Sequence, residues 1–130
     1  MHPPPAAPLV LVADDDRDTR LRLAALLPSA GYRVVETADG ARALARARAG
    51  GVGLVVTELY LPADGRPCLV GALKRGPATR WLPVVVYTAH VTPSDFGWAV
   101  ASGCDTVLRK PASPDALLAE IARLFADPPA

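Results

Sequence analysis

The chain has 130 residues, of which 51% are hydrophobic, enough for one domain whose core needs no metal or disulfide. Its 14 Lys and Arg balance 13 Asp and Glu, so a formal charge of +1 gives no general attraction to nucleic acid or anionic lipid. No apolar run approaches the roughly 20 residues of a membrane span, and no signal-peptide pattern opens the chain, which predicts a cytoplasmic protein. Cys68 and Cys104 form no CxxC pattern, so we expect two free thiols.

Short apolar runs alternate with helical segments along the chain. Residues 1–8 hold three consecutive prolines and predict a flexible N-terminal arm, residues 9–126 the folded domain, and residues 127–130 a tail or the start of a linker. The expected strands are Leu9–Ala13, Tyr32–Thr37, a run from Leu54 that ends on Glu58, Pro83–Thr88 and Asp105–Leu108. The expected helices are Arg17–Leu27, Ala41–Ala49, Arg66–Arg75, a segment from Pro93 to about Ser102 capped by Thr92, and one from Pro114 to about Ala126.

This regular alternation predicts a single α/β domain, a doubly wound parallel sheet with right-handed crossovers. The second strand is the most mixed in polarity, which indicates a place near the sheet edge. Gly97 lies in the middle of the fourth helix, where it costs on the order of 1 kcal/mol relative to Ala. We therefore expect that helix to be the least rigid.

Polar side chains follow four of the expected strands. Since the carboxyl ends of parallel strands meet at one edge of a sheet, these side chains should gather there. They are Asp14, Asp15 and Asp16 after the first strand, Glu58 after the third, Thr88 at the end of the fourth and Lys110 after the fifth.

The four pieces in this order resemble the receiver domains of bacterial two-component response regulators. The resemblance rests on Val-Ala-Asp14-Asp15-Asp16, on Leu-Tyr-Leu-Pro-Ala-Asp-Gly after the third strand, on Thr88-Ala89 and on Lys110-Pro111. It covers the chain from Leu9 to about Phe125 and implies the flavodoxin-like, CheY-like strand order 2-1-3-4-5. It also implies a role in a phosphorelay as a signalling module rather than an enzyme.

In that family an aspartate after the third strand accepts a phosphoryl group from a histidine kinase, with Mg²⁺ and a lysine offsetting the charge. By resemblance, the metal site would comprise Asp14 through a bound water, Asp15 directly, the residue at the phosphoacceptor position and the backbone carbonyl of Tyr60. Thr88 would hydrogen-bond the phosphoryl group and Lys110 would pair with it. The Lys110–Pro111 peptide bond would be cis.

Two departures from the family pattern affect this expectation. Glu58 stands at the phosphoacceptor position in place of aspartate, one methylene further out, and its carboxylate is expected to reach Lys110 or Thr88. Because a misplacement of about 1 Å can cost roughly a hundredfold in rate, phosphorylation there is disfavoured, and Mg²⁺ binding is expected to be weakened. Val107 replaces the aromatic residue expected three positions before the lysine, so the usual relay from Thr88 to the last helices lacks its ring.

The resulting hypothesis is an atypical receiver that works without phosphorylation, by binding a protein partner through the fourth helix, fifth strand and fifth helix. Phe96 and Trp98 would contribute to that face, with one of the two expected in the core. The partner would be a histidine kinase, a phosphotransfer protein or a downstream protein, with no direct binding of nucleic acid or membrane.

Three other functions stay open beside this one. A working phosphorelay receiver would tolerate glutamate, and a structural docking or dimerisation module, including a homodimer, would keep only a vestigial site. A phosphatase of the haloacid dehalogenase type needs Asp-x-Asp-x-Thr after the first strand, but Asp18 stands where counting from Asp14 requires Thr.

Overall fold

A computed structural model describes residues 7–126 of the chain. Residues 1–6 and 127–130, which carry most of the predicted N-terminal arm and all of the predicted tail, lie outside the described part. Within the described part, no helix is long and apolar enough to cross a membrane.

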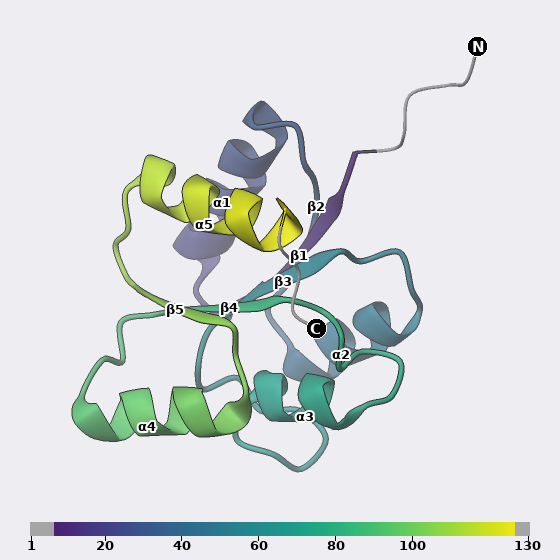
Figure 1. The fold of residues 1–130 in the computed structure, drawn as a ribbon, viewed down its shortest axis with the longest axis vertical. Helices are drawn as coiled ribbons and strands as arrows, with labels where there is room; N and C mark the ends of the chain where they lie inside the picture. The colour runs from purple at the N-terminus through teal and green to yellow at the C-terminus, as the bar shows by residue number, and fades with distance from the viewer. Residues whose placement is uncertain (1–6, 127–130) are drawn as a thin grey trace.

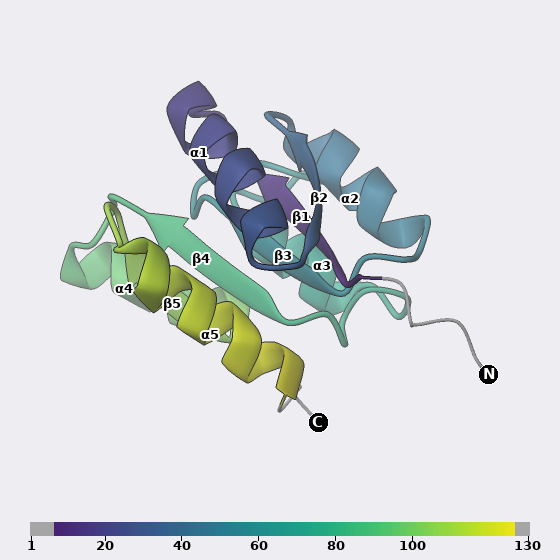
Figure 2. The same cartoon turned by 90° about the horizontal axis from the view of Figure 1, so that it is seen from above.

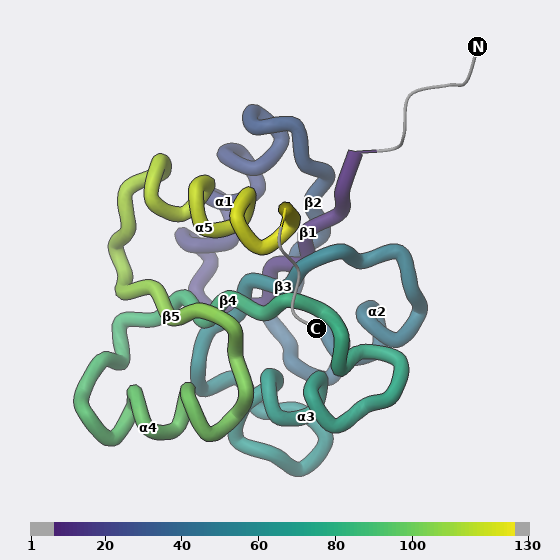
Figure 3. The backbone as a smooth tube through the Cα atoms, in the orientation of Figure 1, coloured from purple at the N-terminus to yellow at the C-terminus, as the bar shows by residue number. Residues whose placement is uncertain are grey.

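Five parallel strands form one sheet in the order β2-β1-β3-β4-β5, which confirms the predicted flavodoxin-like topology (Figure 1). Followed along the backbone, the chain goes from β1 out to β2 and crosses back past β1 to β3, β4 and β5 (Figure 3). The order therefore reverses between β1 and β3, and ligands of open α/β sheets bind at such a reversal. The strands are β1 Leu9–Ala13, β2 Arg33–Thr37, β3 Leu54–Thr57, β4 Val84–Thr88 and β5 Thr106–Arg109.

Five helices cover the two faces of the sheet. Figures 1 and 2 show α1 and α5 together on one face and the other three helices on the opposite face. The helices are α1 Arg17–Ser29, α2 Gly40–Arg48, α3 Leu69–Arg75, α4 Pro93–Ser102 and α5 Pro114–Ala126.

Each face of the sheet has its own apolar core. β1, β3 and β4 are buried along their whole length, so their side chains feed both cores alternately. The core under α1 and α5 is built around Leu27, Leu54 and Ile121, and the core under α2 and α3 around Leu11 and Leu69. β2 lies at an edge with a mixed burial pattern, as predicted.

Two predicted helix boundaries were wrong by two residues or more. α1 continues through Pro28 to Ser29, because a proline in the last turn removes only one hydrogen bond and the helix end is still closed by backbone bonds to Leu27 and Pro28. α3 begins at Leu69 rather than Arg66, since Ala63 and Arg66 pair through their backbones in a tight turn instead. Asp64 takes a positive φ of 52° within that turn.

α4 is well capped but little buried. Thr92 and Asp95 form a reciprocal capping box at its start, and Gly103 closes it in the left-handed conformation. Ala99 is its only buried residue. Phe96 is 57% exposed and Trp98 51% exposed, so the expectation that one of them belongs to the core was wrong. The helix has too few inward positions to bury a large ring.

Candidate functional site

A lysine and two carboxylates meet at the carboxyl ends of β1, β3 and β5. The Nζ of Lys110 lies 2.9 Å from Asp14 Oδ2 and 3.0 Å from Glu58 Oε2. All three side chains are largely withdrawn from solvent, with exposed fractions of 3% for Asp14, 10% for Glu58 and 15% for Lys110. The prediction that Glu58 reaches Lys110 or Thr88 is therefore met at Lys110.

The backbone around each carboxylate fixes its orientation. Asp14 Oδ1 accepts a hydrogen bond of 2.8 Å from the backbone N–H of Asp16, and Glu58 Oε1 accepts one of 2.8 Å from the N–H of Leu59. The N–H of Glu58 donates to the carbonyl of Ala13, which extends the β1–β3 pairing by one residue. In each carboxylate, one oxygen thus accepts a hydrogen bond from a backbone N–H and the other accepts one from the Lys110 ammonium group.

Lys110 enters the site from the end of β5. Its backbone N–H donates to the carbonyl of Thr88, and the Lys110–Pro111 peptide bond is cis, as the resemblance implied. The ammonium also lies 5.7 Å from the centre of the Tyr87 ring, which provides a weak cation–π contact.

The electrostatics of Asp14, Glu58 and Lys110, hereafter the trio, follow from burial and pairing. Burial raises the pKa of Asp14, against the opposing effect of its bonds to Asp16 and Lys110. Burial alone would lower the pKa of Lys110, but its bonds to Asp14 and Glu58 outweigh it and hold that pKa above the usual value. Lys110 is therefore charged at neutral pH, and its bond to Asp14 favours the ionised form of that carboxyl against the effect of burial.

Thr88 lies at the end of β4 and is fully buried. Its hydroxyl oxygen accepts a hydrogen bond of 3.0 Å from the backbone N–H of His90, two residues further along the chain. The hydroxyl group therefore helps to shape the loop that follows β4.

In the described part of the chain, the side chains of Asp15 and Asp16 make no hydrogen bond or ion pair with Lys110 or Glu58. Asp16 is the N-cap of α1, where its carboxylate accepts hydrogen bonds from the backbone and hydroxyl of Thr19. Asp15 is exposed. The structure therefore brings together only Asp14 of the three consecutive aspartates with Glu58 and Lys110.

The carboxylates at the strand ends are the side chains that would hold the magnesium ion implied by the family resemblance. In the part of the chain that the structure describes, no group of three or more His, Cys, Asp or Glu side chains is placed to hold a metal. The Lys110 ammonium already pairs with both of the carboxylates that would help to hold such an ion. This arrangement does not fit a divalent cation, and ligation by Asp14, Asp15, Glu58 and the Tyr60 carbonyl stays a prediction.

The side chain of Tyr60 makes a contact that sequence reasoning missed. Its hydroxyl donates a hydrogen bond of 2.5 Å to Asp95 Oδ1 in the first turn of α4, and its ring meets the edge of His90 at 5.2 Å. This bond raises the pKa of Tyr60 to about 12 and lowers that of Asp95. The capping pattern Thr92-x-x-Asp95 was visible in the sequence, but nothing there indicated a second partner 35 residues away.

The fold and the site edge together define a class of protein. A response regulator receiver domain model matches residues 10–122, and the chain belongs to this family. It is therefore a receiver domain of two-component signal transduction, a class whose general partner is a histidine kinase.

The chain is also similar to parts of longer signalling proteins. It is 28% identical over 114 residues to the CAI-1 autoinducer sensor kinase/phosphatase CqsS of Vibrio cholerae, covering 87% of this chain and 17% of that protein. It is 35% identical over 115 residues to the transcriptional regulatory protein KdpE of Mycobacterium tuberculosis, covering 87% and 49%. The chain thus spans about half, or much less, of the length of these curated relatives.

Solved structures agree with the fold. The chemotaxis protein CheY4 of Vibrio cholerae superposes with a TM-score of 0.80 at 27% identity, covering 91% of this chain and 98% of that one. The receiver domain of the sensor histidine kinase PA1611 from Pseudomonas aeruginosa, described with a magnesium ion coordinated in its active site cleft, gives 0.84 at 24% identity, covering 94% and 100%. The latter likeness concerns the fold alone.

Proposed function

We propose that this chain is an atypical receiver domain that signals without accepting a phosphoryl group. Glu58 takes the phosphoacceptor position in this proposal. The observation that carries it is the double contact of Lys110 Nζ with Asp14 and Glu58, at 2.9 and 3.0 Å. The cation that would meet an incoming phosphoryl group is already bonded to two carboxylates.

The length of the glutamate side chain supports this reading. Glu58 Oε2 reaches the ammonium directly, so its carboxylate occupies the space next to Lys110. The opposite oxygen is held by the N–H of Leu59. Transfer to either oxygen would first require breaking a buried charge-assisted hydrogen bond, which is costly when it leaves a charge unpaired.

The charge balance of Asp14, Glu58 and Lys110 supports a domain whose signalling state does not depend on phosphorylation. Two carboxylates and one ammonium leave one net negative charge in a buried site. In a phosphorylated receiver, extra negative charge arrives only with the phosphoryl group. Here Glu58 supplies its charge continuously, so the partner surface is set by the sequence rather than by a transfer reaction.

A working receiver is the second candidate, favoured by one observation. A groove of about 790 Å³ between α1 and the start of α5 runs up to Lys110 and Tyr87. A helix of a histidine kinase or phosphotransfer protein placed there would bring its histidine to the site edge.

The deciding experiment is intact-mass analysis after incubation with Mg²⁺ and a small-molecule phosphodonor. Parent, Glu58→Asp and Glu58→Asn proteins are treated in parallel, the last as a control of aspartate size without a nucleophile. We expect the parent and Glu58→Asn to stay unmodified and Glu58→Asp to gain one labile phosphoryl group.

The outcome separates the candidates. A phosphoryl group on the parent, lost on mild alkaline treatment, overturns the proposal and makes the chain a working receiver. If Glu58→Asp also stays unmodified while folded, Glu58 is not what blocks transfer, and the site is vestigial rather than held in one state.

A further inference from the structure

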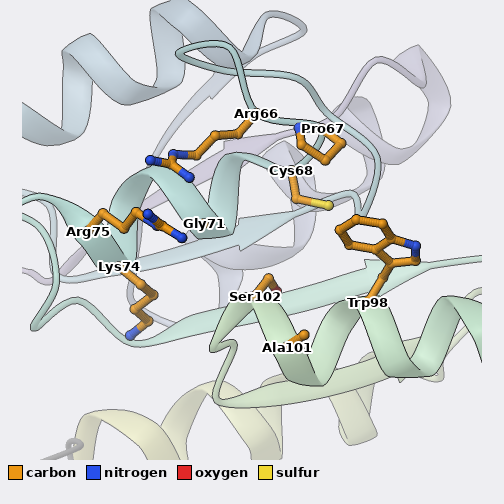
Figure 4. Close-up of a pocket in the computed structure, with 9 residues that line it drawn as sticks. All are labelled: Arg66, Pro67, Cys68, Gly71, Lys74, Arg75, Trp98, Ala101 and Ser102. Atoms are coloured by element: carbon orange, nitrogen blue, oxygen red, sulfur yellow. The ribbon is translucent and has the colours of Figure 1, made fainter.

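A groove of about 340 Å³ separates α3 from α4, on the face of the sheet opposite α1 and α5 (Figure 4). One wall comes from Arg66, from Gly71 and Arg75 of α3, and the other from Trp98, Ala101 and Ser102 of α4. The groove lies on the α3 side of α4, whereas the surface predicted to bind partners lies on its β5 side.

The α3 wall carries two guanidinium groups without partners. Within residues 7–126, the side chains of Arg66 and Arg75 make no hydrogen bond or ion pair, and both point over Gly71 (Figure 4). Lys74 on the same helix differs, because its ammonium bonds to Asp105 and to the carbonyl of Leu82. The groove thus presents two uncompensated positive charges whose planar forks match carboxylates.

The α4 wall is apolar. Trp98 is half exposed and extends toward Cys68, whose thiol lines the groove (Figure 4). The hydroxyl of Ser102 donates to the carbonyl of Ala99 in its own helix, so it offers little to a ligand. Opposite the arginines there is an aromatic surface but no free polar group to read a base or a sugar.

We infer that this groove binds an acidic segment of a protein partner, with an apolar or aromatic side chain against Trp98 and flanking carboxylates on Arg66 and Arg75. The charge complementarity commits the site to an anionic chain. Lys74 and Ser102 also line the groove but are bonded within the protein, which favours a peptide over a nucleotide, whose base would find no partner. An open groove between two helices also admits an extended segment.

The inference deepens the proposed function, on which it rests for the existence of a protein partner. It adds that partner's chemistry and places the contact beside α3 rather than beside β5. Its failure and that of the proposed function are distinguishable, because phosphoryl transfer is read by mass and peptide binding by calorimetry.

The test is calorimetric titration with the end-blocked peptide Glu-Asp-Phe-Asp-Glu at low salt. We expect saturable binding to the parent, weakened about tenfold by Arg66→Glu, by Arg75→Glu and by Trp98→Ala. The matched control is Arg22→Glu, which reverses an exposed arginine on α1 and is expected to change the affinity less than about twofold. Circular dichroism checks that each variant is folded.

Each contrary result overturns the inference. Equal weakening by Arg22→Glu would mean general charge attraction, and equal affinity for Gln-Asn-Phe-Asn-Gln would mean that the arginines take no part. Tighter binding of adenosine monophosphate, lost in Arg66→Glu, would make this a nucleotide site. No binding of the acidic peptide to the folded parent rejects the inference outright.

Discussion

The site at the strand ends and the groove between α3 and α4 differ in whether their positively charged side chains are paired with carboxylates. At the ends of β1, β3 and β5, Lys110 is largely withdrawn from solvent and bonded to two carboxylates. In the groove between α3 and α4, Arg66 and Arg75 have no partner in the described part of the chain. The position where receivers perform chemistry is electrostatically satisfied, and a position without assigned chemistry is not.

This difference indicates where interaction energy remains for a partner. A satisfied buried network resists change, because any rearrangement exposes an unpaired charge to a medium of low polarity. Arg75 is exposed and Arg66 is only half-buried, so both gain by pairing without such a cost. The comparison favours a domain whose centre is fixed and whose periphery recognises a partner.

Removing the Lys110 ammonium group is the test of this comparison with the largest expected effect on stability. Lys110→Met keeps the side-chain length but leaves Asp14 and Glu58 buried together without an ammonium group. We expect a loss of about 3 kcal/mol in the free energy of unfolding at neutral pH, measured by chemical denaturation. The reason is the penalty of two adjacent, uncompensated carboxylates.

Two further variants test the cause of that loss. Arg109→Met removes the exposed cation of the preceding residue and is expected to cost less than about 0.5 kcal/mol. Adding Glu58→Gln to Lys110→Met should recover at least about 1 kcal/mol, because one of the two stranded charges disappears. A Lys110→Met protein as stable as Arg109→Met would mean that the trio is not a closed network.

The sequence was sufficient to predict the fold and to predict which residues lie at the carboxyl ends of the strands. Apolar runs buried on both faces and capped helices at regular intervals leave few topologies, and parallel strands bring their carboxyl ends together. Asp14, Glu58, Thr88 and Lys110 could be placed at one edge for that reason. The direct reach of Glu58 to Lys110 followed from the extra methylene.

Side-chain direction was harder to predict than position. Three consecutive aspartates after β1 looked equivalent, but the turn into α1 directs Asp16 to the helix N-terminus and leaves Asp15 exposed. Tyr60 was expected to matter through its backbone carbonyl, whereas its hydroxyl reaches Asp95 on α4. Such contacts depend on loop geometry, which no periodicity encodes. The exposed Phe96 and Trp98 show the same limit for α4.

A smaller effect would sharpen the contrast between the fixed centre and α4. Gly97 has a negative φ, and a Cβ built there meets no atom within 4 Å. Gly97→Ala is expected to stabilise the protein by about 0.5 to 1 kcal/mol and to slow amide exchange in α4, since alanine loses less entropy in a helix. The measurement is hydrogen exchange combined with chemical denaturation.

The control lies at the other end of the same helix. Gly103 has a φ of 90°, and its added Cβ would lie 3.4 Å from Lys74 Cγ, so Gly103→Ala should destabilise by about 1 kcal/mol. Unchanged exchange in Gly97→Ala would show that α4 is already as rigid as its neighbours. The comparison with the centre would then rest on charge alone.

The smallest effect concerns the one described side-chain hydrogen bond that joins the loop after β3 to α4. The bond from Tyr60 to Asp95 raises the pKa of Tyr60 from 10.0 to about 12. A raised pKa means that the folded state holds the proton more tightly. The stability contributed by this bond is therefore complete below pH 10 and is lost as the pH rises through about 12.

Phenolate absorbance during an alkaline titration reads this directly, because the chain has only three tyrosines. We expect Tyr60 to ionise near pH 12 in the folded parent, and Tyr60→Phe to remove that step. Tyr87→Phe serves as the control that should retain it. If the high step survives in Tyr60→Phe, the bond to Asp95 does not hold the proton, and α4 is not tied to the site loop through this pair. If it disappears only in Tyr60→Phe, then α4 is joined to the loop after β3 by a bond that alkali can release.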